Sequence, residues 1–97
     1  MVYATEADLL NVALFGKTGG EWRREFPDLH GNMRDHATIV QLVVLANIES
    51  LNAVLIHQGL AQSERLLQLN QVAIQQIPTL LKNQSMKKLR EPSTSKR

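Results

Sequence analysis

The feature that most constrains the fold is a long apolar segment in the middle of the chain, IVQLVVLANIESLNAVLIHQG, which begins at Ile39. Between Ile39 and Ile48 apolar residues cover nearly the whole circumference of a helix, and such a helix belongs at the centre of a domain. The paired valines would also suit a strand, but the run is about 20 residues long and lacks period-two alternation. The segment therefore predicts a central helix over residues 39–58, which starts at a Thr38–Gln41 capping box.

A second long segment, SERLLQLNQVAIQQIPTLL, follows a short connection around Gly59. Its apolar residues recur at intervals of three and four, which predicts an amphipathic helix over residues 62–81. Because the connection is short, the two long helices must run antiparallel as a hairpin. Pro78 lacks an amide, so we expect a kink or an early end there rather than a smooth continuation to Leu89.

Two short helices are expected before the hairpin, over residues 6–15 and 19–26. Thr5 is a suitable N-cap for the first, and Thr18 with Glu21 has the spacing of a capping box for the second. Trp22 and Phe26, four residues apart, would share a face and anchor the second helix onto the long ones. The fold class is therefore all-α, with two short N-terminal helices that cover the open side of a long antiparallel hairpin.

Composition limits the kind of protein. A chain of 97 residues forms one small domain with a modest core, and it contains no cysteine for disulfides or thiolate sites. The N-terminus has acidic residues where a secretory signal would be basic, and the apolar runs fall short of the ~20 residues of a membrane span. We therefore expect a soluble, cytoplasmic protein with no membrane partner.

Charge divides the chain into two parts. Residues 1–81, the expected helical domain, carry five Lys/Arg and eight Asp/Glu, whereas residues 82–97 carry six and one, which gives −3 and +5. The second part has almost nothing apolar to bury, so we expect a mostly disordered basic tail. Its cationic residues are candidate phosphate contacts for a nucleic acid: Lys82, Lys87, Lys88, Arg90, Lys96 and Arg97.

The stretch LHGNMRDHATI gathers polar residues just before the central helix. Asn and Asp bond nearby backbone and Gly tolerates positive φ, so the stretch is better explained as a hydrogen-bonded corner than as a ligand site. The residues of this corner are His30, Asn32, Arg34, Asp35 and His36. No metal-ligand spacing, catalytic triad pattern or phosphate loop is present, so we expect no enzyme, no cofactor and no small-molecule substrate.

Excess apolar surface on the central helix favours association with a second copy, as a dimer, or with a partner protein. Two short helices and one partner helix would not cover every face of so apolar a helix. The residues predicted to face the partner are Val40, Val44, Leu45, Ile48, Leu55 and Leu60. Asn47 is expected to be buried among Val43, Leu51 and Val54 and to bond a partner on another helix or chain.

Several words of the sequence occur in the order found in a known family: VYATEADLLNVALFGKT, EWR, GNMRDHATIVQLVVLANIESLNAVLI, ERLLQLN and AIQQ. Over roughly residues 2–81 the chain resembles the helical C-terminal region of phage and bacterial proteins that carry a KilA-N domain, a presumed DNA-binding module. The KilA-N domain itself has no counterpart here. The resemblance implies an accessory part of a phage-derived or bacterial regulatory protein.

Two functions are therefore expected. The preferred one is a non-catalytic helical interaction or oligomerisation module. The alternative is nucleic-acid binding through the basic tail, without sequence readout, because no helix combines Arg, Asn or Gln with a basic stripe.

Overall fold

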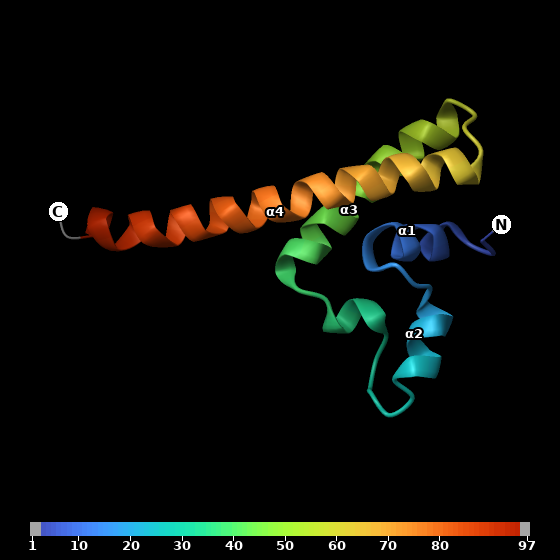
Figure 1. Cartoon of the computed structure of the whole chain (residues 1–97), viewed down its shortest axis with the longest axis horizontal. Helices are drawn as coiled ribbons and strands as arrows, with labels where there is room; N and C mark the ends of the chain where they lie inside the picture. Colours follow the sequence, from blue (N-terminus) through green and yellow to red (C-terminus); the bar gives the residue numbers. More distant parts are fainter. Residues whose placement is uncertain (1–2, 96–97) are drawn as a thin grey trace.

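The computed structural model describes the backbone of residues 3–95 and the side chains of residues 3–82, and over these ranges it is helical without strands (Figure 1). The elements in chain order are α1 (Glu6–Phe15), α2 (Gly19–Glu25), the 3-10 helix η1 (Met33–His36), α3 (Ile39–His57) and α4 (Gln62–Ser95). The all-α class and the antiparallel pairing of α3 with α4 are as predicted from the sequence.

Local capping fixes where the helices start. The Thr38 hydroxyl accepts from the Gln41 amide at 3.1 Å, and the Gln41 side chain accepts from the Thr38 amide at 2.9 Å. The same reciprocal pair joins Thr18 and Glu21 at the head of α2. These bonds satisfy amides that have no partner inside the helix, so short-range sequence signals were sufficient to place both starts.

Three helices build the core. α1 lies against both α3 and α4 and closes the open side of the hairpin. The most completely buried side chains come from all three of these helices: Leu9, Val44, Ile48 and Leu69. Because α1 is anchored on both long helices, the core is a three-helix arrangement.

α2 does not pack on the long helices as the sequence predicted. It lies chiefly against η1, and Trp22 is buried with its ring centroid 5.3 Å from that of His36. Phe26 is largely exposed. The reason lies in the connecting loop, where Arg23 donates to the Leu29 carbonyl at 2.6 Å and also to Gly31, so the chain folds back onto α2.

α4 includes Pro78 and its backbone continues to Ser95, past Leu81, where the sequence predicted the end of the helix and the start of a mostly disordered tail. Proline removes one bond to the carbonyl of Ile74, but both residues are exposed, so water can satisfy that carbonyl. The neighbouring Thr79 hydroxyl donates to the Gln75 carbonyl at 3.0 Å. Side chains of the predicted tail lie outside the described residues from residue 83 onward, and Lys82 is exposed.

Candidate interaction surface

The residues predicted to face a partner are instead part of the chain's own core. Five of them are buried, and Leu60 packs against the same cluster: Val40, Val44, Leu45, Ile48 and Leu55. α1 and α4 both contact α3 and cover this face. These residues therefore pack inside the chain rather than on a face open to a partner, because a helix that is apolar all round gives no sign of which face its neighbours will cover.

The opposite face of α3 is the uncovered one. Its residues recur at alternating intervals of four and three, and all six are exposed: Ile39, Val43, Ala46, Ser50, Ala53 and His57. We call this set the outer seam. Ile39 is 74% exposed, and the flanking Leu42, Val54 and Ile56 are also open to solvent. An amphipathic surface helix would carry charged residues at such positions, whereas the outer seam contains no Asp, Glu, Lys or Arg.

One acid borders the outer seam. Glu49 is exposed, and its Oε2 lies 3.8 Å from Nη1 of Arg34. Arg34 also donates from Nε to Oδ1 of the buried Asn11 at 3.1 Å, which ties the corner before α3 to α1. The edge of the face is thus nearly neutral, since the carboxylate has a guanidinium beside it.

Asn47 was expected to be buried and hydrogen-bonded to another helix or chain. The structure shows the hydrogen bond but not the burial. Its side chain is exposed, and Nδ2 donates to Oε1 of Gln76 on α4 at 2.9 Å. The contact joins the two long helices at one register. It is a solvent-side bond, so it contributes less than a buried one would.

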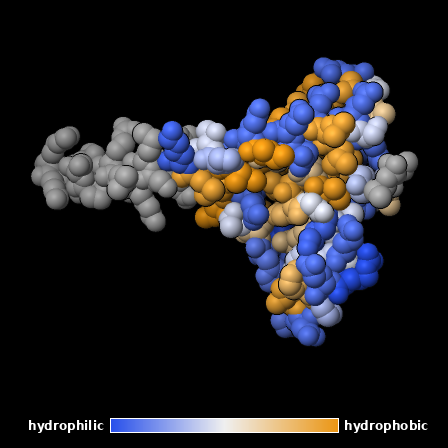
Figure 2. Space-filling view, viewed as in Figure 1, coloured by the Kyte–Doolittle hydropathy of each residue, from blue (hydrophilic) through white to orange (hydrophobic). Residues whose placement is uncertain are grey.

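α4 also shows a row of apolar side chains outside the core. Leu67 and Ile74 are 67% and 63% exposed, and Leu81 is about half exposed. The three are spaced by seven residues and therefore share one side of the helix. Figure 2 shows apolar surface gathered along α4 across this face of the molecule.

A buried polar network holds the three core helices together. Arg65 is only 6% exposed and donates from Nη1 to Oε1 of Glu6 at 2.5 Å and to Oδ1 of Asn52 at 2.9 Å. Its Nε donates to the Leu60 carbonyl at 3.0 Å, and Asn52 donates to Glu6 at 2.9 Å. The bonds from Arg65 and Asn52 lower the pKa of the Glu6 carboxyl below its ordinary value.

Sequence reasoning did not single out Arg65 or its ion pair with Glu6. A signal was present, because Arg65 stands four and eight residues before the buried Leu69 and Ala73 and so lies on the same face of α4. A charged residue on a core face needs a partner. The identity of that partner depends on how α1 packs against α4, and no local sequence pattern predicts this packing.

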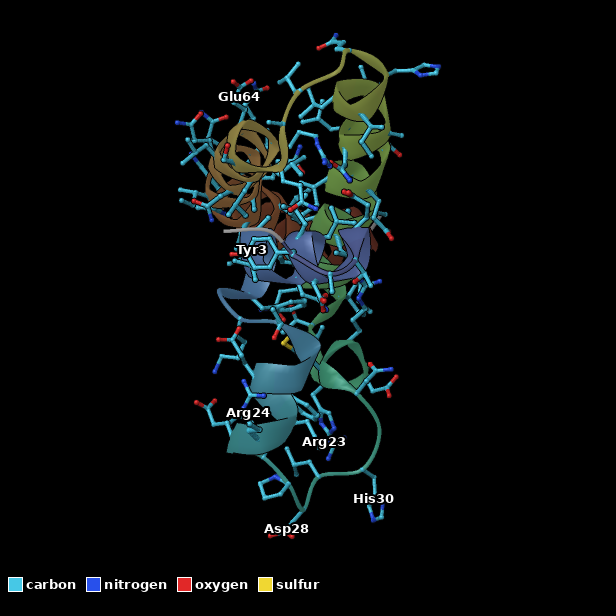
Figure 3. All side chains as sticks on the ribbon, turned by 90° about the vertical axis from the view of Figure 1, so that its right-hand side faces the viewer. Tyr3, Arg23, Arg24, Asp28, His30 and Glu64 are labelled. Carbon is cyan, nitrogen blue, oxygen red and sulfur yellow. The ribbon has the colours of Figure 1, made fainter. Side chains whose placement is uncertain are left out.

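The polar corner is bonded internally. Asn32 and Asp35 cap each other's amides at 3.1 and 2.8 Å, and Nε2 of His36 lies 2.7 Å from the His30 carbonyl oxygen. Figure 3 shows the His30 and Asp28 side chains at the tip of the loop, pointing away from the body. Asn32, Asp35 and His36 therefore serve the local fold, and Arg34 ties the corner to Asn11 of α1.

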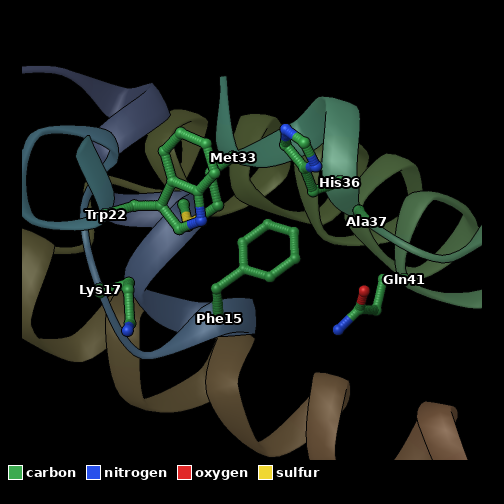
Figure 4. A pocket seen from close by; sticks show the side chains of 7 residues that line it. All are labelled: Phe15, Lys17, Trp22, Met33, His36, Ala37 and Gln41. Carbon is green, nitrogen blue, oxygen red and sulfur yellow. The ribbon is translucent and has the colours of Figure 1, made fainter. Parts of the chain in front are cut away.

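A shallow cavity of about 200 Å³ lies between the end of α1, α2 and the start of α3. Phe15, Trp22, Met33 and His36 form its apolar wall, as Figure 4 shows, with Lys17 and Gln41 at the rim. Lys17 is already paired with Glu25 at 2.5 Å. No carboxylate lines this cavity, and no group of three His, Cys, Asp or Glu suited to a metal occurs among the residues that could be searched.

By length and composition α3 is apolar enough to cross a membrane, with 28% of the relevant stretch buried. Mostly buried core helices of soluble proteins and signal sequences have the same property. Here Asn52 of this helix belongs to the ion network with Glu6 and Arg65, which a bilayer interior would strongly disfavour.

Comparisons with known proteins add no relative: no family model, no curated protein and no solved structure matches the chain.

Proposed function

We propose that the chain is a non-catalytic helical interaction module, and that its binding surface is the outer seam of α3 with its apolar flanks. The observation that carries this proposal is the exposure of a long, uncharged helix face directly opposite the core. Contiguous apolar surface of this kind marks a site of association with another molecule rather than a surface that stays exposed to solvent. The resemblance to the helical region that follows KilA-N domains supports an accessory role in a phage-derived or bacterial regulatory protein of the cytoplasm.

The composition of the other surfaces supports the absence of catalysis in this proposal. The cavity near Trp22 has a paired lysine and no carboxylate, and the His36 ring in its wall bonds the His30 carbonyl oxygen through Nε2. Asn32 and Asp35 cap each other's amides, and Arg34 bonds Asn11. General acid–base or nucleophilic chemistry needs a base in reach of a reacting group, and the contacts of these residues are with other groups of the chain.

The test is the accessibility of a single thiol, which the cysteine-free sequence makes unambiguous. Ser50→Cys places a thiol in the middle of the outer seam, and Gln68→Cys places a matched one on an exposed position of α4. In cells that make the protein, we expect maleimide to label the Ser50→Cys thiol about tenfold more slowly than in a dilute purified sample, as for a surface about nine-tenths covered.

The rate for Ser50→Cys is taken relative to that for Gln68→Cys in each sample, because glutathione and the cell envelope slow the labelling of both thiols in cells. An equal ratio of the two rates in cells and in the dilute sample would show that nothing covers the outer seam, and the proposed function would then be rejected.

A second candidate, nucleic-acid binding, rests on the segregation of charge. The last 16 residues hold six of the eleven Lys/Arg of the chain. Such a cluster attracts phosphates without reading sequence.

A further inference from the structure

We propose that the outer seam of α3 is occupied by a second copy of this chain, with the two α3 helices antiparallel about a two-fold axis near Ile48. This inference rests on the proposed function, because it names the partner of the same surface. A two-fold interface joins one patch to itself, so the patch must be complementary to its own reversed copy. Spacing, side-chain size and charge on α3 each bear on that requirement.

The spacing of the outer seam is that of a helix that packs along another helix. Its positions alternate by four and three from Ile39 to His57, which keeps them on one line when two helices wind around each other. The alternation reads the same in both directions. Reversing one copy about Ile48 therefore puts Val43 opposite Ala53, and Ala46 opposite Ser50.

Side-chain size favours the antiparallel direction. The N-terminal part of the face is bulky, with Ile39, Leu42 and Val43, whereas Ala46, Ser50 and Ala53 follow as small residues. In a parallel pair, bulky residues would meet at one end and small ones along the rest, so the helices would diverge or leave voids. In an antiparallel pair the larger Ile39 and His57 meet at each end, and Val43 meets the small Ala53. Ala46 and Ser50 meet at the centre, so both ends are filled equally and the helices do not diverge towards one end.

Charge at the edge of the seam is compatible with self-association. Residues that flank an antiparallel seam meet the corresponding flank of the partner, which pairs the exposed Leu42 with Ile56. Glu49 would approach its own copy near the axis. Arg34, 3.8 Å from that carboxylate, reduces the repulsion.

The size of the face sets the strength of the dimer. A helix of 19 residues is about 28 Å long, and one helix face of that length buries less than the roughly 800 Å² per partner of a standard interface. The dimer should therefore be at the weak end of specific interfaces, with a dissociation constant on the order of micromolar. The occupant can then leave the surface on dilution.

The experiment uses the full purified chain and two single-cysteine variants, Ala46→Cys and Ser50→Cys, at exposed positions of α3. Under mild oxidation, a mixture of the two should form the mixed disulfide at least about fivefold faster than either variant alone forms its own, because a disulfide needs Cβ atoms within about 4.5 Å. Gln68→Cys, outside the seam, should not be cross-linked above the rate of random collision. Circular dichroism of each variant confirms that the fold is retained.

Light scattering on the unmodified chain completes the test. We expect the mass to rise from one to two chains as the concentration passes through the micromolar range, and Ser50→Glu to abolish the rise while Gln68→Glu leaves it unchanged. Faster self-coupling of Ala46→Cys than mixed coupling would overturn the antiparallel arrangement.

A monomeric mass at all concentrations, with no cross-linking, would overturn the second copy as occupant. Slow labelling of Ser50→Cys in cells, together with a monomer in the purified sample, would retain the proposed function and assign the surface to a different protein. Rapid labelling in cells would reject both.

Discussion

Arg65, on α4, is hydrogen-bonded to side chains of both α1 and α3. It is buried, and its donors meet a carboxylate on α1, an amide on α3 and a carbonyl at the end of the hairpin connection. Glu6, the carboxylate, has a side chain 44% exposed, so solvent screens part of the attraction. The network therefore acts mainly through geometry, because it fixes the angular position of α1 against the hairpin and leaves no buried donor of Arg65 without a partner.

The pKa of Glu6 makes this network sensitive to acid. Its folded-state pKa is lowered from the ordinary 4.5, chiefly by the bond from Arg65, so its stabilisation is complete above that value and is lost as the pH falls through the lower folded-state value. We predict that Glu6→Gln removes part of the stability difference between about pH 7 and about pH 3, as measured by urea denaturation. Glu64→Gln, at an exposed position in the same part of the molecule, is the control. An unchanged difference in the Glu6 variant would mean that the ion pair does not contribute.

Among the elements, α4 departs most from its local sequence signals because it contains Pro78. The ring blocks one backbone bond and crowds the Ile74 carbonyl, yet the helix is retained because Leu69, Ala73 and their neighbours pack on α1 and α3. Tertiary packing thus overrides a local signal, as it often does for marginal helices.

Removing this proline should stabilise the chain. Pro78→Ala restores the missing amide and relieves the crowding at Ile74, and we predict a gain of about 1–3 kcal/mol in the free energy of unfolding, since proline costs about 3 kcal/mol relative to alanine inside a helix. Urea denaturation measures the gain, and far-ultraviolet circular dichroism measures helix content. Gln75→Ala, at an exposed site one turn away, should change the stability by less than about 0.5 kcal/mol. No gain in the proline variant would show that the helix accommodates the proline without cost.

The sequence predicted where helices begin better than which face of a helix is buried. Thr18 and Thr38 predicted helix starts correctly because capping depends on residues only three apart. The covered face of α3 was not predictable in the same way, since Val43 and Val44 are equally apolar and only the positions of α1 and α4 leave one exposed and bury the other. The residues that the sequence predicted to face a partner consequently lie on the inner side of α3.

At the scale of the whole molecule, the core and the basic charge occupy different parts of the chain. Leu80 is the last described side chain that packs against the core, and the excess of lysine and arginine begins two residues later. The segment before it is net acidic. Folding and any attraction to phosphate should therefore be separable, because the residues that serve one are absent from the other.

Truncation after Lys82 tests this separation and, with it, the alternative function. We predict that residues 1–82 unfold within about 2 °C of the full chain, because all the core residues are retained. We also predict that any affinity of the full chain for duplex DNA at low salt is lost with the tail. Counterion release scales with the number of cationic contacts, and residues 83–97 hold five of the six Lys/Arg of residues 82–97. Thermal denaturation and fluorescence anisotropy with a labelled duplex, over a salt series, measure the two effects. Retained DNA affinity with an unchanged salt dependence would place the contacts in the folded part, whereas a large fall in stability would show that residues beyond Lys82 support the core.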